Sequence, residues 1–188
     1  MFAKTTYELV ADASQTTVVL APSFVTALAG LGVSPGGLDA GNLIVSGGVA
    51  TAVFGIPTGR FDSSNLRLQF VHTGGLTLRA GSTFVILSDF IIESLAAGPR
   101  LTGLVRVNDT IVGRIPLFTL TLAGAPEVKS FDSTTDAGTA GTINIKASLR
   151  LTDAAATALN GVFGGRPFAK DIAIGDGTVR GIYLDDVR

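Results

Sequence analysis

His72 is the single histidine of this chain, which has no cysteine. Metal sites built from thiolates or from several histidines are excluded, because the sequence has no cysteine and no second histidine. The same lack excludes most catalysis by side-chain nucleophiles. The acidic side chains are spread over separate expected strands and turns, as at Asp89, Glu93 and Glu127. No motif would pair two of them as a general acid and a general base. We therefore expect no enzyme, no metal site and no resident cofactor.

His72 closes a segment in which alternate positions are apolar, namely Leu66, Leu68 and Phe70. This alternation is typical of a half-buried strand. One hypothesis is that His72 makes the polar contact to a ligand held among phenylalanines, with Phe54, Phe61 and Phe70 as the candidate binding residues. The alternative is a histidine bonded to a backbone carbonyl and water, beside a core that the phenylalanines fill. The wider candidate lining adds Phe84, Phe90 and Phe118.

The composition indicates one domain with a weakly charged surface. The 188 residues can bury a continuous core, and no change of composition suggests a linker, so we expect a single domain over residues 1–188. Apolar residues make up 46% of the chain and charged residues 15%, with a net charge of −1. Such a surface favours a homo-oligomer or contact with other surface proteins. It offers no basic field for phosphates, which argues against nucleic acid as a partner.

Short apolar and β-branched segments, separated by Gly-rich or polar turns, recur along the chain. Asn108-Asp109 lies between two of them and predicts a tight hairpin, because both residues tolerate positive φ. Turn signals at this spacing predict an all-β fold, either an antiparallel β-sandwich or a partly open barrel. The expected strands are residues 16–20, 42–45, 49–54, 66–72, 76–79, 83–87, 90–93, 104–107, 110–114 and 115–122.

Two short Ala-rich helices are expected near residues 22–30 and 153–161. Pro22 suits a first helical turn, and Thr152 or Asp153 can cap the second helix. A weak internal repeat supports both, because each follows a strand and ends in the pattern Ala-Leu-x-Gly. Ala-rich faces can approach a sheet closely, so we expect the two helices to plug the open ends of the sandwich or barrel.

The compartment is predicted from charge and cysteine usage. Residues 13–38 carry no formal charge, but Pro22, Pro35 and several glycines interrupt them, so we expect no transmembrane span. Met1–Asp12 has no apolar segment behind Met1 and is not a signal peptide, so a natural signal would have been removed. The absence of cysteine fits export. We therefore expect an extracellular or cell-surface location.

Several segments resemble the central strands of HtaA-type domains. They are Phe54–Asp62, Leu66–Phe70, His72–Leu78 and Leu87–Ile92, and Leu151–Phe163 is similar to the Ala-rich helix that ends these domains. The resemblance covers roughly residues 50–175. HtaA-type domains are secreted or cell-surface β-domains of bacteria, best known for capturing haem. The resemblance implies such a location, haem as an alternative cofactor, and His72 at the position of the family's histidine beside a Gly-Gly turn.

The chain departs from the family pattern where the family binds iron. It has no tryptophan, whereas these domains open with a Trp-Gly helix. The tyrosine that family members use as the iron ligand has no counterpart near Ser23–Gly32 or around Phe163-Gly164, and Tyr7 and Tyr183 match no family position. His72 could still ligate iron or hydrogen-bond a ligand-bound tyrosine.

Two classes of function follow. In the first, the domain is a non-catalytic structural or adhesive module that self-associates through strand edges, with Tyr7–Val10 and Ile182–Leu184 as the terminal strands most able to be exchanged. In the second, it binds haem or another apolar ligand between its strands. A charge in place of Phe70 or Leu78 is expected to unfold the domain, and His72→Ala is expected to change little.

Overall fold

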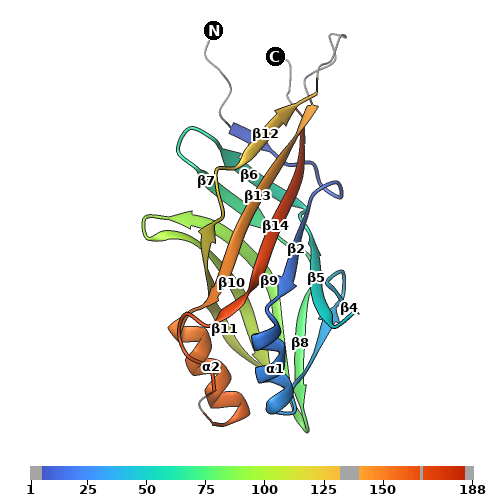
Figure 1. The fold of residues 1–188 in the computed structure, drawn as a ribbon, viewed down its shortest axis with the longest axis vertical. Helices are drawn as coiled ribbons and strands as arrows, with labels where there is room; N and C mark the ends of the chain where they lie inside the picture. Colours follow the sequence, from blue (N-terminus) through green and yellow to red (C-terminus); the bar gives the residue numbers. More distant parts are fainter. Residues whose placement is uncertain (1–5, 132–139, 166, 185–188) are drawn as a thin grey trace.

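The computed structural model describes residues 6–131, 140–165 and 167–184. Its strands are antiparallel neighbours in a 14-stranded sheet that curls around the core as a partly open barrel (Figure 1). The prediction of an all-β fold with two short helices is confirmed. Of the two predicted architectures, the sandwich and the partly open barrel, the chain adopts the partly open barrel. The elements are β1 (Thr6–Glu8), β2 (Gln15–Leu20), α1 (Pro22–Gly30), β3 (Ser34–Leu38), β4 (Asn42–Ser46), β5 (Val49–Gly55), β6 (Thr58–Asp62), β7 (Arg67–Val71), β8 (Gly75–Ala80), β9 (Thr83–Leu95), β10 (Gly98–Val107), β11 (Thr110–Leu122), β12 (Glu127–Ser130), β13 (Ala140–Leu151), α2 (Asp153–Phe163) and β14 (Ala173–Leu184).

The order of strands differs from their order in sequence. It runs β1-β6-β7-β9-β10-β11-β13-β14-β2-β5-β4, with β12 beside β13 and with β8 between β9 and β3. The predicted tight hairpin joins β10 to β11, where Val107 pairs with Thr110 and Asn108 has a φ of 51°. The last strand, β14, pairs with β13 on one side and with the early strand β2 on the other. It therefore lies inside the sheet and not at its edge.

Both helices lie at the same end of the sheet (Figure 1). β2 and β13 are each antiparallel to β14, so they run in the same direction, and each is followed directly by a helix. This corrects the expectation that the two helices plug opposite open ends. Within the described part of the chain, no helix is long and apolar enough to cross a membrane.

Local contacts fix the two helices. The Thr152 hydroxyl accepts a hydrogen bond from the Ala155 amide at 3.1 Å, which caps α2 as predicted. The Asn160 side chain exchanges two hydrogen bonds with the backbone of Phe168, at 2.7 and 3.1 Å, and so holds the segment after α2 against the helix. The Phe168 ring lies 6.3 Å from the Phe24 ring of α1. The two helices therefore share one packed cluster at their end of the sheet.

The opposite end is closed around Tyr183, which is fully buried. Its ring lies 4.7 Å from that of Tyr7, and Leu9 forms an isolated bridge to it. Gly141 leaves room for the Tyr183 hydroxyl, which lies 3.0 Å from the Ser130 hydroxyl. The two terminal segments that were expected to be exchangeable therefore lie side by side and belong to one closed end.

Several strand assignments differ from the sequence-based expectation, which also missed β12 and most of β13 and β14. β3, with the sequence Ser-Pro-Gly-Gly-Leu, lies where no strand was expected, yet it pairs with β8. A Cβ on Gly37 would lie 2.4 Å from the Gly41 carbonyl oxygen, so the glycines permit a close backbone approach there. β9 is continuous where a break was expected, because Asp89 adopts a φ of 51° without interrupting the strand.

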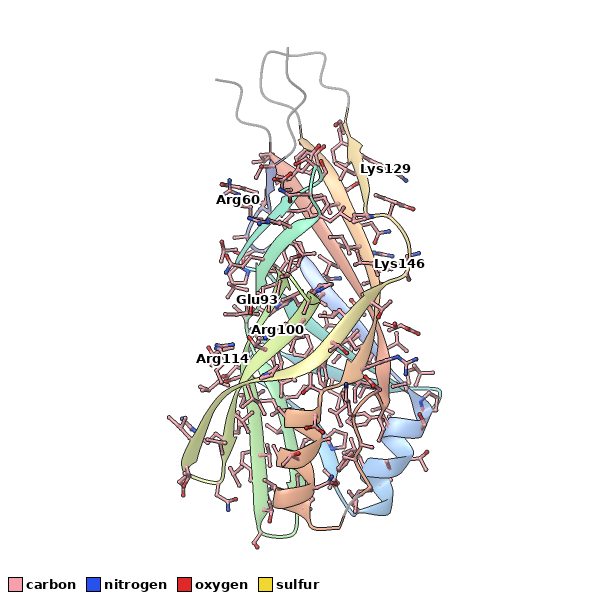
Figure 2. The ribbon with its side chains drawn as sticks, turned by 90° about the vertical axis from the view of Figure 1, so that its left-hand side faces the viewer. Arg60, Glu93, Arg100, Arg114, Lys129 and Lys146 are labelled. Atoms are coloured by element: carbon pink, nitrogen blue, oxygen red, sulfur yellow. The ribbon has the colours of Figure 1, made fainter. Side chains whose placement is uncertain are left out.

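Charged side chains gather on the outer face of the sheet (Figure 2). Arg60, Gln69, Glu93 and Arg100 occupy successive paired positions across β6, β7, β9 and β10. Arg100 and Glu93 form an ion pair at 3.3 Å. The inner face is apolar, so the alternation of each strand separates a solvent-facing surface from the core.

Candidate ligand cavity

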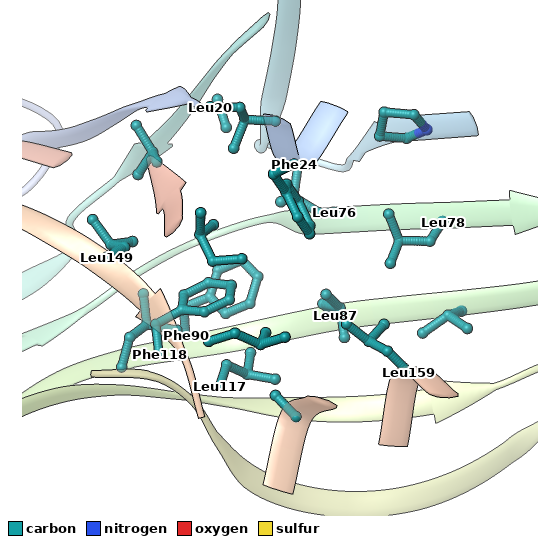
Figure 3. Close-up of a pocket in the computed structure, with 18 of the residues that line it drawn as sticks. Leu20, Phe24, Leu76, Leu78, Leu87, Phe90, Leu117, Phe118, Leu149 and Leu159 are labelled. Atoms are coloured by element: carbon teal, nitrogen blue, oxygen red, sulfur yellow. The ribbon is translucent and has the colours of Figure 1, made fainter. Parts of the chain in front are cut away.

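An apolar cavity lies between the inner face of the sheet and the two helices (Figure 3). The free volume is about 80 Å³. A typical ligand pocket has at least about 300 Å³, so a larger ligand needs the helices to move outward. The lining from the sheet includes Leu20, Leu78, Leu87 and Phe90, and the lining from the helices includes Phe24, Leu28, Ala158, Leu159 and Val162.

Thr16 and His72 are the polar side chains of the cavity lining, and they bond to each other. The Thr16 hydroxyl oxygen lies 2.7 Å from His72 Nε2, and His72 Nδ1 lies 3.2 Å from the carbonyl oxygen of Phe90. Because a carbonyl only accepts, the ring proton sits on Nδ1, and Nε2 accepts the hydrogen of the Thr16 hydroxyl. Both side chains are 4% exposed. The cavity therefore presents carbon to a ligand and keeps its one polar pair satisfied.

Burial lowers the pKa of His72 from its ordinary value of 6.5 to about 4, against the smaller raising effect of the Phe90 and Phe70 carbonyls. The ring is therefore neutral at pH 7 in the folded protein, and its charged form is the one that the site disfavours.

The free energy of unfolding is expected to fall on acidification. The unfolded chain takes up the His72 proton near pH 6.5 and the folded chain only near pH 4, so the stabilisation from the neutral ring is complete above pH 6.5 and is lost as the pH drops to 4. The loss between pH 7 and pH 5 is about 2 kcal/mol. Urea unfolding at both pH values measures it, with His72→Phe as the reference. An equal loss in His72→Phe would assign the pH dependence to other groups.

The structure separates the four candidate binding residues. Phe54 and His72 both line the cavity, where the Phe54 ring packs edge-on against Phe90 at 5.2 Å. Phe70 is fully buried and lines a second, smaller cavity of about 30 Å³. Phe61 lies outside both cavities and stacks on Tyr7 near the closed end. Of the wider set, Phe90 and Phe118 line the main cavity, whereas Phe84 lies under the Arg79 guanidinium.

Sequence reasoning missed the contribution of the helices to the cavity. Ala155, Ala158, Leu159 and Val162 line it from α2, at the i, i+3, i+4, i+7 spacing of one helical face. That spacing was a usable signal. Thr16 was also missed, and no sequence signal links it to a histidine that lies 56 positions further along the chain.

The lining offers no free iron ligand. Both ring nitrogens of His72 are engaged, and the two tyrosines lie together at the closed end, with rings 4.7 Å apart. Among the residues that the structure describes, no group of three or more His, Cys, Asp or Glu could hold a metal ion. The cavity therefore offers apolar contacts and no group that is free to coordinate a metal ion.

Comparisons with known proteins support the fold. No protein-family model matches the chain, and no curated protein matches its sequence. Among solved structures, the chain is similar to the C-terminal domain of HtaA from Corynebacterium glutamicum, with a TM-score of 0.64 and 14% identity over 95% of this chain and 99% of that one. It is also similar to a domain-swapped dimer of a histidine-to-alanine variant of that domain, with a TM-score of 0.52 and 14% identity over 86% and 90% of the two chains. The chain therefore has the fold of the HtaA C-terminal domain.

Proposed function

We propose that this domain is a non-catalytic binding module that holds an apolar ligand between its curled sheet and the helices α1 and α2. The observation that carries the proposal is the cavity itself, which is lined by carbon and closed at one end by two Ala-rich helices. Pockets of this kind occur in the mouths of β-barrels. Together with the HtaA-like fold and the cysteine-free sequence, it supports a secreted or cell-surface carrier.

The ligand that fits best is uncharged within the cavity and needs no metal coordination. A carboxylate placed inside would find no cation, because the cavity lining includes no lysine or arginine. Haem, which the family resemblance implies, would need His72 to release Thr16 or Phe90 before a nitrogen could reach iron. We therefore favour a hydrocarbon chain or ring over haem, and titration with haemin, followed by absorbance, distinguishes the two.

Ala158→Phe is expected to weaken ligand binding. Ala158 faces the cavity from α2, so a phenyl group there occupies the space that a ligand would take. The affinity for the uncharged fluorophore N-phenyl-1-naphthylamine should fall by about tenfold or more. Ala154→Phe is the matched control, because Ala154 is exposed on the same helix. Equal affinities in the two variants, with both folded by circular dichroism, would exclude this cavity as the binding site.

Self-association is the second candidate function. It is favoured by the domain-swapped dimer of the structurally similar variant and by the apolar surface of the edge strand β4, where Ile44 is 48% and Val45 is 68% exposed. No charged residue lies between Asp39 and Arg60, so this edge lacks the lysines that usually protect a free strand. Light scattering across a concentration series tests the idea. A monomer mass from micromolar to near-millimolar protein would rule it out.

A further inference from the structure

We propose that the main cavity and the second, smaller cavity form one narrow site for a single unbranched hydrocarbon chain. The ligand is a single-chain amphiphile whose tail lies along the barrel and whose polar head stays at the helix end. This inference rests on the proposed function and names the shape and class of its ligand. It also gives the second cavity a role, with Ala147 and Gly177 as the residues that limit the length of the chain.

The two cavities lie end to end along the barrel. β13 passes from the main cavity at Leu151, through Leu149, to the second cavity at Ala147. Because α2 begins at Asp153, directly after β13, this order leads away from the helices. The linings of the two cavities follow one another in the same direction on four further strands, which are β9 from Phe90 to Ile92, β10 from Val105 to Pro99, β11 from Phe118 to Leu122 and β14 from Ile174 to Val179.

The partition between the cavities is thin and consists of side chains. Those that line both cavities are Thr16, Val18, Leu101 and Leu149. Gly177 lies at this partition, where a Cβ would be 3.0 Å from Leu149 Cδ1 and 3.9 Å from Val18 Cγ2. The absence of a side chain at Gly177 leaves Leu149 room to change rotamer. A slim chain can therefore pass from the main cavity into the second one.

The Thr16–His72 pair lies beside this passage and does not obstruct an apolar chain. Thr16 lines both cavities, whereas His72 lines the main cavity alone. Their bond of 2.7 Å satisfies the hydroxyl group and Nε2, so methylene groups can lie over the pair without leaving a polar atom unpaired. A hydroxyl or carboxyl group within the ligand would find no free partner there. The pair therefore favours a plain hydrocarbon tail.

The dimensions of the joined site fit a chain better than a ring. The free volumes are about 80 and 30 Å³, so a ligand one methylene wide displaces the fewest wall atoms. Figure 3 shows Leu149 on the opposite side of the main cavity from Leu159 of α2. From Leu151 to Ile145 the lining of β13 extends over about 20 Å. An extended chain of roughly 15 carbons has this length, because a carbon–carbon bond measures about 1.5 Å.

The direction of the chain follows from the two ends of the barrel. The end away from the helices is closed around the fully buried Tyr183, so it leaves no place for a polar head. The head therefore stays at the helix end, and the tip of the tail reaches the second cavity.

The test varies the length of the tail. Octyl, decyl, dodecyl and tetradecyl maltoside, each below its critical micelle concentration, compete with N-phenyl-1-naphthylamine for the unaltered protein. Their uncharged sugar head is the same, so only the tail differs. We expect each two added carbons to raise the affinity about tenfold, because each buried methylene adds a similar increment.

Ala147→Val is expected to shorten the accepted chain. It adds two carbons to the wall of the second cavity alone, which they fill. The gain in affinity from dodecyl to tetradecyl maltoside should fall to less than about twofold, with the octyl compound as the reference in each protein. Ser148→Val is the matched control, because it adds an apolar side chain at the next position, on the outer face of β13. It should keep the unaltered dependence on length.

Gly177→Ala is a second variant at the partition. Its Cβ presses on Leu149 and narrows the passage, so it should shorten the accepted chain in the same way. This variant keeps the test valid if Ala147→Val fails to fold.

The possible failures are distinct. If folded Ala147→Val and Gly177→Ala bind the dye and keep the unaltered dependence on length, the joined site is wrong and the main cavity alone remains. An equal loss of affinity for all four maltosides would also overturn the joined site, because it would show an effect on the main cavity and not on the tip of the tail. An unaltered protein that binds neither the dye nor any maltoside would overturn the proposed function itself.

Discussion

Phe70→Glu is expected to leave the domain unfolded at pH 7. Phe70 is fully buried on β7, and a carboxylate there would face the apolar lining of the second cavity, which includes Leu68, Ile92 and Leu101. Loss of the phenyl ring alone costs about 3 to 5 kcal/mol, and an unpaired buried charge adds several more. The sum is comparable to the whole stability of a typical domain, about 5 to 15 kcal/mol. Circular dichroism and one-dimensional NMR measure the outcome.

Two control variants separate burial from charge. Phe70→Leu keeps the site apolar and should lower the free energy of unfolding by about 1 to 2 kcal/mol. Gln69→Glu adds the same charge one position earlier, on the exposed face of β7, and should fold normally. A folded Phe70→Glu protein with native-like dispersion would show that β7 is not packed as described.

The second large effect is expected at the Thr16–His72 pair. His72→Phe leaves the Thr16 hydroxyl without its partner in an apolar wall, and Thr16→Val does the same to His72 Nε2. Each single change should lower the free energy of unfolding by about 2 kcal/mol. The double variant removes both polar groups and should cost clearly less than the sum, with a coupling energy of about 2 kcal/mol. Urea unfolding of the four proteins measures the cycle.

The sequence led to a different expectation, that replacing His72 would change little, because its partner could not be identified. A negligible effect of His72→Phe alone would support that earlier expectation. Additive single effects in the cycle would mean that the bond between Thr16 and His72 contributes nothing to stability.

Local patterns predicted part of the elements. The Asn108-Asp109 turn and the Ala-rich segments were each sufficient, because hairpins and helices depend on neighbouring residues. The alternation ending at Phe70 predicted β7, but Leu66 precedes that strand and is 46% exposed. Most of β13 and β14 was missed. β3 was missed since its Pro-Gly-Gly sequence has no strand propensity of its own. It pairs because Gly36 and Gly37 let the backbone approach its neighbours, which only the assembled sheet makes visible.

The cavity was predicted less completely, for a reason of topology. Phe54 and Phe61 are close in sequence, yet the chain passes from β5 to β6 between them and carries Phe61 toward the closed end. The position of both helices at one end depends on β2 and β13 flanking β14, a long-range pairing that no local pattern encodes. Side chains that meet through such pairing can be assigned only from the fold.

The place of β14 inside the sheet also governs the order in which the molecule can assemble. β14 is one of the two neighbours of β2, so one edge of this early strand can pair only with a strand from the far end of the described chain. Pairing over so long a separation makes folding slow, because the entropy cost of closing the loop comes before the stabilising contacts form. During synthesis the backbone edge of β2 that pairs with β14 therefore stays without its partner until β14 has been made. A chain that folds this slowly exposes an unpaired strand edge for longer, which makes it more prone to aggregate before its last long strand has been added.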